Sequence, residues 1–96
     1  MDKKSLLCFG WKMAQDLAWR KVENEGVILN LRTSEYFSFN QAGTFIWELL
    51  CRGTAPASIS RKLAEEFEIN EGRAACDLEE FLRTLCAEKL IEKTSR

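Results

Sequence analysis

Apolar and polar residues alternate along the first half of the chain, whereas apolar residues recur every three or four positions in the second half. The alternating segments are residues 17–22, 27–31 and 35–39, and each matches the two-residue period of a half-buried strand. Turn-forming residues fill positions 24–26 and 32–34 between them. Because consecutive strands joined by short turns pair antiparallel, we predict a three-stranded antiparallel meander.

The two faces of these strands carry different side chains. One face of the second strand carries Val27, Leu29 and Leu31. In the third strand Phe37 and Phe39 share one face, and Tyr36 and Ser38 share the other. We expect Phe37 and Phe39 to lie in the core, because the alternation places both rings on the same side of the strand.

Three amphipathic helices are predicted after the third strand. The first covers about residues 41–51, with Asn40 as its N-cap and Gly53 at its end. Its inner stripe carries Ala42, Phe45, Ile46, Leu49 and Leu50. Trp47 lies off this stripe, and we expect its large ring to be buried in the core as well.

The second and third helices follow with their own start signals. Thr54 is expected to cap the second helix, and Pro56 fits its first turn because the N–H there would lack a partner anyway. The apolar face of this helix carries Ile59, Leu63, Ala64 and Phe67. Asn70 is expected to cap a third helix of roughly residues 71–88. Its stripe carries Ala74, Ala75, Leu78, Phe81, Leu82, Leu85 and Cys86, after which Leu90 and Ile91 close the core or begin a short final strand.

The beginning of the chain has no clean period. A strand, a short helix and a loosely held arm all remain open for residues 1–15. With 96 residues the chain fits one domain, which we place at residues 16–96 after an N-terminal arm of residues 1–15. A small sheet must bury its apolar face against helices. The predicted fold is therefore α+β, a winged helix-turn-helix in which a three-stranded antiparallel sheet precedes three helices.

The composition argues against an enzyme. Histidine, the commonest general base and metal ligand, is absent. The four cysteines form no C-x-x-C pair, so neither a zinc site nor a redox dithiol is indicated. No glycine-rich loop is present to hold a phosphate group. We therefore predict no catalytic residues, no cofactor and no metal.

The N-terminal residues and the net charge of the chain indicate where the protein is located and which partners it lacks. Lys3 and Lys4 precede an apolar stretch of residues 6–11, which is too short for a signal peptide or a membrane span. We expect a cytoplasmic protein with reduced thiols and no membrane partner. The net charge of −1 gives no general attraction to nucleic acid or anionic lipid.

An ordered set of short motifs runs from about residue 17 to residue 91. The motifs are Trp19-Arg20, Val27-Ile28-Leu29, Ser34-Glu35-Tyr36-Phe37-Ser38-Phe39-Asn40, Gly43, Ile46-Trp47, Gly53-Thr54, Ile59, Leu63-Ala64, Phe67, Asp77, Phe81-Leu82, Leu85 and Leu90-Ile91. In this order they resemble the PqqD family, named for the D protein of pyrroloquinoline quinone (PQQ) biosynthesis and belonging to the RiPP recognition elements. The chain departs from the family pattern at Phe39, where leucine is usual, and at Glu35 and Lys89, where glycine is common.

The resemblance implies a non-catalytic peptide chaperone of natural-product biosynthesis. Such a protein binds the leader segment of a ribosomally made precursor peptide and presents it to a modifying enzyme, such as a radical SAM enzyme or a leader peptidase. The leader adds as a strand to the third strand, in a groove beside the third helix. The implied site consists of Glu35, Tyr36, Phe37, Ser38 and Phe39 on the strand, with Ala74, Ala75, Leu78, Leu82 and Leu85 on the helix.

The third strand itself has the composition of an edge that is left open. Residues 35–39 contain neither proline nor lysine, the residues that usually block strand edges. Such an edge can accept a peptide by strand addition. It can equally pair with a second copy of the chain, so a homodimer is a possible alternative.

DNA binding is the other alternative, since winged helix-turn-helix proteins include many repressors. The third helix would be the reading helix, yet between Glu71 and Glu88 it carries two arginines against five acidic residues, a net charge of −3 that repels phosphate. Within this helix Asp77 either pairs with Arg73 or contacts a basic leader residue, and Arg83 has the same ambiguity with opposite sign.

Overall fold

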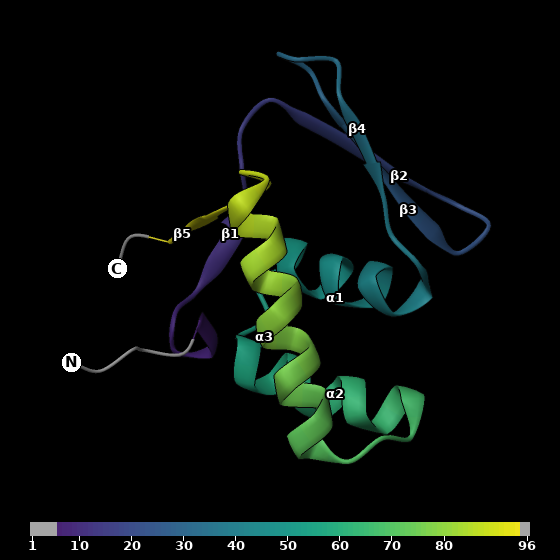
Figure 1. Cartoon of the computed structure of the whole chain (residues 1–96), viewed down its shortest axis with the longest axis vertical. Helices are drawn as coiled ribbons and strands as arrows, with labels where there is room; N and C mark the ends of the chain where they lie inside the picture. The colour runs from purple at the N-terminus through teal and green to yellow at the C-terminus, as the bar shows by residue number, and fades with distance from the viewer. Residues whose placement is uncertain (1–5, 95–96) are drawn as a thin grey trace.

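The computed structural model describes residues 6–94 as three helices packed beneath a three-stranded sheet (Figure 1). In chain order the elements are η1 (Leu6–Cys8, a 3₁₀ helix), β1 (Trp11–Met13), β2 (Leu17–Val22), β3 (Glu25–Asn30), β4 (Tyr36–Ser38), α1 (Gln41–Cys51), α2 (Pro56–Phe67), α3 (Glu71–Ala87) and β5 (Ile91–Lys93). The antiparallel sheet has the order β2-β3-β4, while β1 and β5 form a separate two-stranded sheet. The predicted α+β fold is confirmed.

The first hairpin turn differs from the prediction. Glu23 and Asn24 form the turn with φ of 53° and 71°, and β3 begins at Glu25. Two successive positive φ angles are typical of the tight turn that suits a twisted hairpin, and asparagine tolerates that conformation. Gly26 is therefore part of the ladder, paired with Lys21, and the turn predicted at residues 24–26 was misplaced. A Cβ at Gly26 would lie 3.2 Å from the Thr44 hydroxyl.

The core lies between the inner face of the sheet and α1. Trp19, Ile28 and Phe37 lie side by side across the three strands. Trp47 is 0% exposed, and its ring is 6.4 Å from Trp19 and 5.7 Å from Phe39, which confirms its expected core position. Phe37 and Phe39 are half-buried against the same cluster. The opposite face of the sheet exposes Leu29 and Tyr36.

The predicted helix ends are correct at three of four positions. Asn40 accepts a hydrogen bond from the Gly43 N–H (2.8 Å), and Asn70 accepts one from the Arg73 N–H (2.7 Å). Gly53, with φ of 83°, ends α1. The prediction that Thr54 caps α2 was wrong. Its N–H donates to the Leu49 C=O at the end of α1, and Ala55 precedes Pro56 as a cap without a side-chain hydrogen bond.

The first part of the chain contains both a short helix and a strand. Trp11 of β1 is paired with Lys93 of β5, and its side chain is only 8% exposed. Its indole N–H donates to the Leu6 C=O at 2.9 Å. The described part of the expected arm thus shares the core of the domain, and residues 91–93 form the final strand that was one of two alternatives. Residues 1–5, with Lys3 and Lys4, lie outside the described residues.

Candidate functional site

The outer edge of β4 carries backbone groups that point away from the sheet. The Phe39 N–H donates to the Gly26 C=O (2.9 Å), and the Asn30 N–H donates to the Glu35 C=O (2.8 Å). Hydrogen-bonded pairs alternate with non-hydrogen-bonded pairs in an antiparallel ladder. With the register Ile28↔Phe37, the N–H and C=O groups of Tyr36 and Ser38 therefore point outward.

This edge is unpaired within residues 6–94. β4 is the last strand of its sheet, and β1 pairs with β5 instead of with β4. Tyr36 is 73% exposed, and Glu35 and Ser38 are exposed too. The five predicted strand residues thus lie together, with four outward backbone groups between them and the phenylalanine rings turned inward.

The predicted helix residues lie differently. Ala74, Leu78, Leu82 and Leu85 are all 0% exposed, because α3 packs along this stripe against α2 and η1. These four side chains therefore belong to the core and do not line a groove. Ala75 alone among the five is half-buried. Phe81 of α3 lies closer to the strand, since its ring is 5.1 Å from the ring of Phe39, the residue that follows β4.

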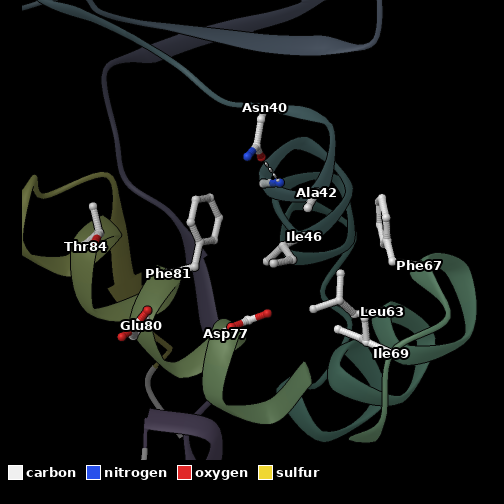
Figure 2. A pocket seen from close by; sticks show the side chains of 11 residues that line it. Asn40, Ala42, Ile46, Leu63, Phe67, Ile69, Asp77, Glu80, Phe81 and Thr84 are labelled. Atoms are coloured by element: carbon white, nitrogen blue, oxygen red, sulfur yellow. Dashed lines mark hydrogen bonds between the residues drawn. The ribbon is translucent and has the colours of Figure 1, made fainter. Parts of the chain in front are cut away.

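Two pockets lie at the two ends of β4, and both have α3 as a wall. The first has a volume of about 440 Å³ and lies where α1, α2 and α3 converge (Figure 2). Its lining residues are Asn40, Ala42, Gly43, Ile46, Leu63, Phe67, Ile69, Asp77, Glu80, Phe81 and Thr84. We call it the helix pocket. The sequence did not reveal this pocket, because its floor joins residues from three helices and the groove was expected between the third strand and the third helix.

The second pocket is polar and lies at the other end of the strand. It has a volume of about 520 Å³ and includes Glu35 just before β4, together with Cys86 and Glu88 at the end of α3. Because Asn40 borders the helix pocket and Glu35 borders this one, β4 runs antiparallel to α3 from one pocket to the other. A peptide paired with β4 would therefore follow α3.

A glycine brings α1 close to this wall. A Cβ at Gly43 would lie 3.2 Å from both the Phe39 side chain and the Phe81 ring. The absence of a side chain thus lets the first turn of α1 approach the two rings. This contact gives a physical reason for a glycine at the position that the sequence motif includes.

Two of the described thiols have raised pKa values. Cys51, Cys76 and Cys86 are free. Burial and then the charge of Glu48 raise the pKa of Cys51 to about 11, and burial raises the pKa of Cys86. A thiol with a raised pKa is less often a thiolate, which is the reactive form. The side chain of Cys8 lies outside the described part of the structure.

Residues 6–94 contain no group of three or more His, Cys, Asp or Glu side chains that could hold a metal ion. Among the helices of the same residues, none has the length and apolar character needed to cross a bilayer.

These features define a class of protein: an α+β domain of the winged-helix type with an open sheet edge between two pockets. The family model described as coenzyme PQQ synthesis protein D (PqqD) matches residues 25–91, so the chain belongs to the PqqD family. The family expected from the sequence motifs is confirmed.

Two solved structures are similar to this chain. One is described as TbiB1 in complex with the TbiA(beta) leader peptide; it is 29% identical, with a TM-score of 0.81 over 88% of this chain and 99% of that one. The other, a lasso peptide synthetase B1 complexed with the leader peptide, is 20% identical, with a TM-score of 0.80 over 86% of this chain and 98% of that one. At 20% identity, the similarity to the lasso peptide synthetase B1 supports the fold alone. No curated protein matches the chain.

Proposed function

We propose that this protein binds the leader segment of a ribosomally made precursor peptide by strand addition to β4. The observation that carries the proposal is the row of four outward backbone groups on Tyr36 and Ser38, on an edge that no described strand occupies. Each backbone hydrogen bond to a guest strand would contribute roughly 0.5–1.5 kcal/mol net. The family and the 29% identical leader-peptide complex support a leader peptide as the ligand.

The protein acts as a carrier that presents the peptide to a separate modifying enzyme. Raised thiol pKa values and the lack of histidine support a role without catalysis. A radical SAM enzyme and a leader peptidase both remain suitable partners. A short precursor gene beside a modifying-enzyme gene would identify the pair to test.

DNA binding, the alternative from the sequence, has no support from the comparisons, since both similar structures are complexes with leader peptides. The acidic side chains of α3 argue against it as well, because they repel phosphate. We do not propose it.

A titration followed by NMR tests strand addition directly. If a short precursor gene lies beside the gene for this protein, a synthetic peptide with its leader sequence is added to ¹⁵N-labelled protein. We expect the largest amide shifts at residues 35–39 and along the α3 wall from Asp77 to Cys86. Shifts confined to α2, or tight binding to a DNA duplex that weakens with salt, would contradict the proposal.

A proline substitution at the edge gives the sharper test. Ser38→Pro deletes one outward N–H and crowds the ladder, while leaving the hydrogen bonds to β3 in place. We expect the leader to bind at least about tenfold more weakly, as loss of roughly 1.4 kcal/mol requires. Ser38→Ala keeps the N–H and is the matched control, with an expected change below about twofold. Equal affinity of the proline variant, with an unchanged NMR fold signature, would overturn strand addition.

A further inference from the structure

The helix pocket combines an apolar floor with space for a long side chain. The floor is formed by Ala42, Ile46, Leu63, Phe67, Ile69 and Phe81. Figure 2 shows the Phe81 and Phe67 rings on opposite sides of the pocket, with Ile46 and Leu63 between them. Its volume of about 440 Å³ leaves room for a long chain of methylene groups. An extended aliphatic stem therefore meets apolar surface on both sides.

The charged residues lining this pocket are both acidic. Asp77 and Glu80 lie three residues apart on α3 and so project from the same side of the helix. The Asp77 carboxylate is 3.4 Å from the Arg73 guanidinium, and both side chains are largely exposed. Such a pair is weak, so Asp77 can exchange Arg73 for another cation at little cost. The rim of the pocket thus favours a positive charge.

The position of the pocket fits a peptide that lies on β4. Asn40 lines the pocket and is two residues beyond Ser38, the last residue of β4. An extended strand advances about 3.3 Å per residue. A guest strand paired with Tyr36 and Ser38 therefore brings its next one to three residues to the mouth of the pocket.

We propose that the helix pocket takes a lysine or arginine side chain of the bound leader, next to the segment that pairs with β4. This inference rests on the proposed function. The methylene stem packs against Phe81 and Ile46, while the cation reaches Asp77 or Glu80. The Phe81 ring adds an attractive face for the cation. An aliphatic side chain makes only the apolar contacts, and an acidic side chain is repelled by the rim.

Small probes test the pocket without the strand. Nα-acetyl-lysine methylamide and its norleucine counterpart have similar stems and differ in the ammonium group. In an NMR titration we expect the lysine probe to shift the signals of Ile46, Asp77 and Phe81 and to bind about threefold to tenfold more tightly than norleucine. Raising the salt to about 1 M should reduce this preference, because exposed charges are then screened.

A double substitution on α3 provides the matched control. Asp77→Asn with Glu80→Gln keeps the size of both side chains and removes the negative charges from two exposed positions. In this variant the lysine and norleucine probes should bind equally. Equal binding of the two probes to the unaltered protein, or shifts away from the pocket, would overturn the proposal.

A scan of the leader separates this inference from strand addition. Each leader residue is replaced in turn by lysine and by methionine, and affinities are measured for the unaltered protein, the double variant and Ser38→Pro. We expect one position beside the paired segment at which lysine exceeds methionine by about threefold to tenfold, but only when both acids are present. If Ser38→Pro weakens every peptide and no such position exists, strand addition stands and the pocket proposal fails. If the lysine preference exists but Ser38→Pro has no effect, the pocket proposal stands and strand addition fails.

Discussion

Lys89 holds a backbone conformation that favours glycine. It follows α3 with φ of 62°, and its N–H donates to the Cys86 C=O at 3.0 Å. The next N–H, of Leu90, donates to the Leu85 C=O at 2.9 Å, which completes a common helix-ending motif. The family resemblance of the sequence motifs implies glycine at this position. The turn is kept here, although the Cβ of Lys89 makes the left-handed conformation less favourable than it would be for glycine.

Replacing Lys89 with glycine should therefore stabilise the protein. We expect Lys89→Gly to raise the free energy of unfolding by about 0.5–1 kcal/mol, because the Cβ clash of the left-handed conformation is removed. Urea denaturation followed by circular dichroism measures the change. Lys89→Ala is the control, since it removes the charge but keeps the Cβ. An equal gain in the alanine variant would assign the effect to charge instead of to the backbone.

Residue-level prediction worked where the chemistry is local. The side chains of Asn40 and Asn70 each accept a hydrogen bond from the N–H three residues later. Their capping role can therefore be inferred from the few residues that follow each of them. Thr44 could not be found in this way. Its hydroxyl accepts from the Gly26 N–H at 2.7 Å, across a separation of 18 residues. Only the completed fold brings these two groups together.

At the level of elements, Thr44 joins the sheet to α1. Its hydroxyl receives the Gly26 N–H and donates to the Asn40 C=O at 2.8 Å. The side chain is only 2% exposed. Because Gly26 and Phe39 mark the end of the β3–β4 ladder, this hydroxyl fixes the angle at which the chain leaves β4 and enters the helix.

Loss of the Thr44 hydroxyl should destabilise the connection between the sheet and α1. Thr44→Val leaves the buried Gly26 N–H without its partner, so we expect the free energy of unfolding to fall by about 1–3 kcal/mol. Thermal or urea denaturation measures this loss of stability. Faster hydrogen exchange at the Gly26 N–H would show that the loss arises at this contact. Thr44→Ser retains the hydroxyl and should lose distinctly less. An unchanged free energy of unfolding in Thr44→Val, which keeps the methyl group and lacks the hydroxyl, would contradict this role of the hydroxyl.

The stripe of α3 shows why the site was only partly predicted. The sequence indicated the apolar stripe of this helix, but not which part of the stripe another element would cover. Packing of α2 and η1 covers the centre of the stripe at Leu78 and Leu82. The pocket wall is instead made by Asp77 and Phe81 at its margin. The geometry of the strand half of the candidate site can be inferred more fully from the sequence, because alternation alone fixes which residues of a strand share a face.

At the level of the whole molecule, β1 and β5 attach the beginning of the described chain to its end. Trp11 packs in the same core cluster as Leu90 and Ile91, and the Leu6 N–H donates to the Glu79 carboxylate at 3.1 Å. The sequence left this segment open because its apolar residues fit no period over so short a length. Its partners lie about 80 residues away in the register Trp11↔Lys93.

Truncation of Trp11 should therefore destabilise the entire domain. Removing a buried tryptophan side chain from a core costs about 3–5 kcal/mol, and we expect Trp11→Ala to approach that range. Lys12→Ala, an exposed neighbour in the same strand, should change stability by less than about 0.5 kcal/mol. A single cooperative transition at lower urea concentration is the expected result. An unchanged midpoint for Trp11→Ala would mean that the segment is not part of the folding unit.

The edge of β4, which pairs with no other strand of residues 6–94, has a consequence for the solubility of the protein. Lysine and proline keep natural strand edges from joining other chains, and Tyr36–Ser38 contain neither. Under the proposed function, such a residue at the edge would also hinder the leader peptide. The same edge lies beside the exposed apolar residues Leu29, Leu31 and Tyr36. A strand edge of this composition favours aggregation until another strand covers it, so a bound leader would also keep the protein in solution.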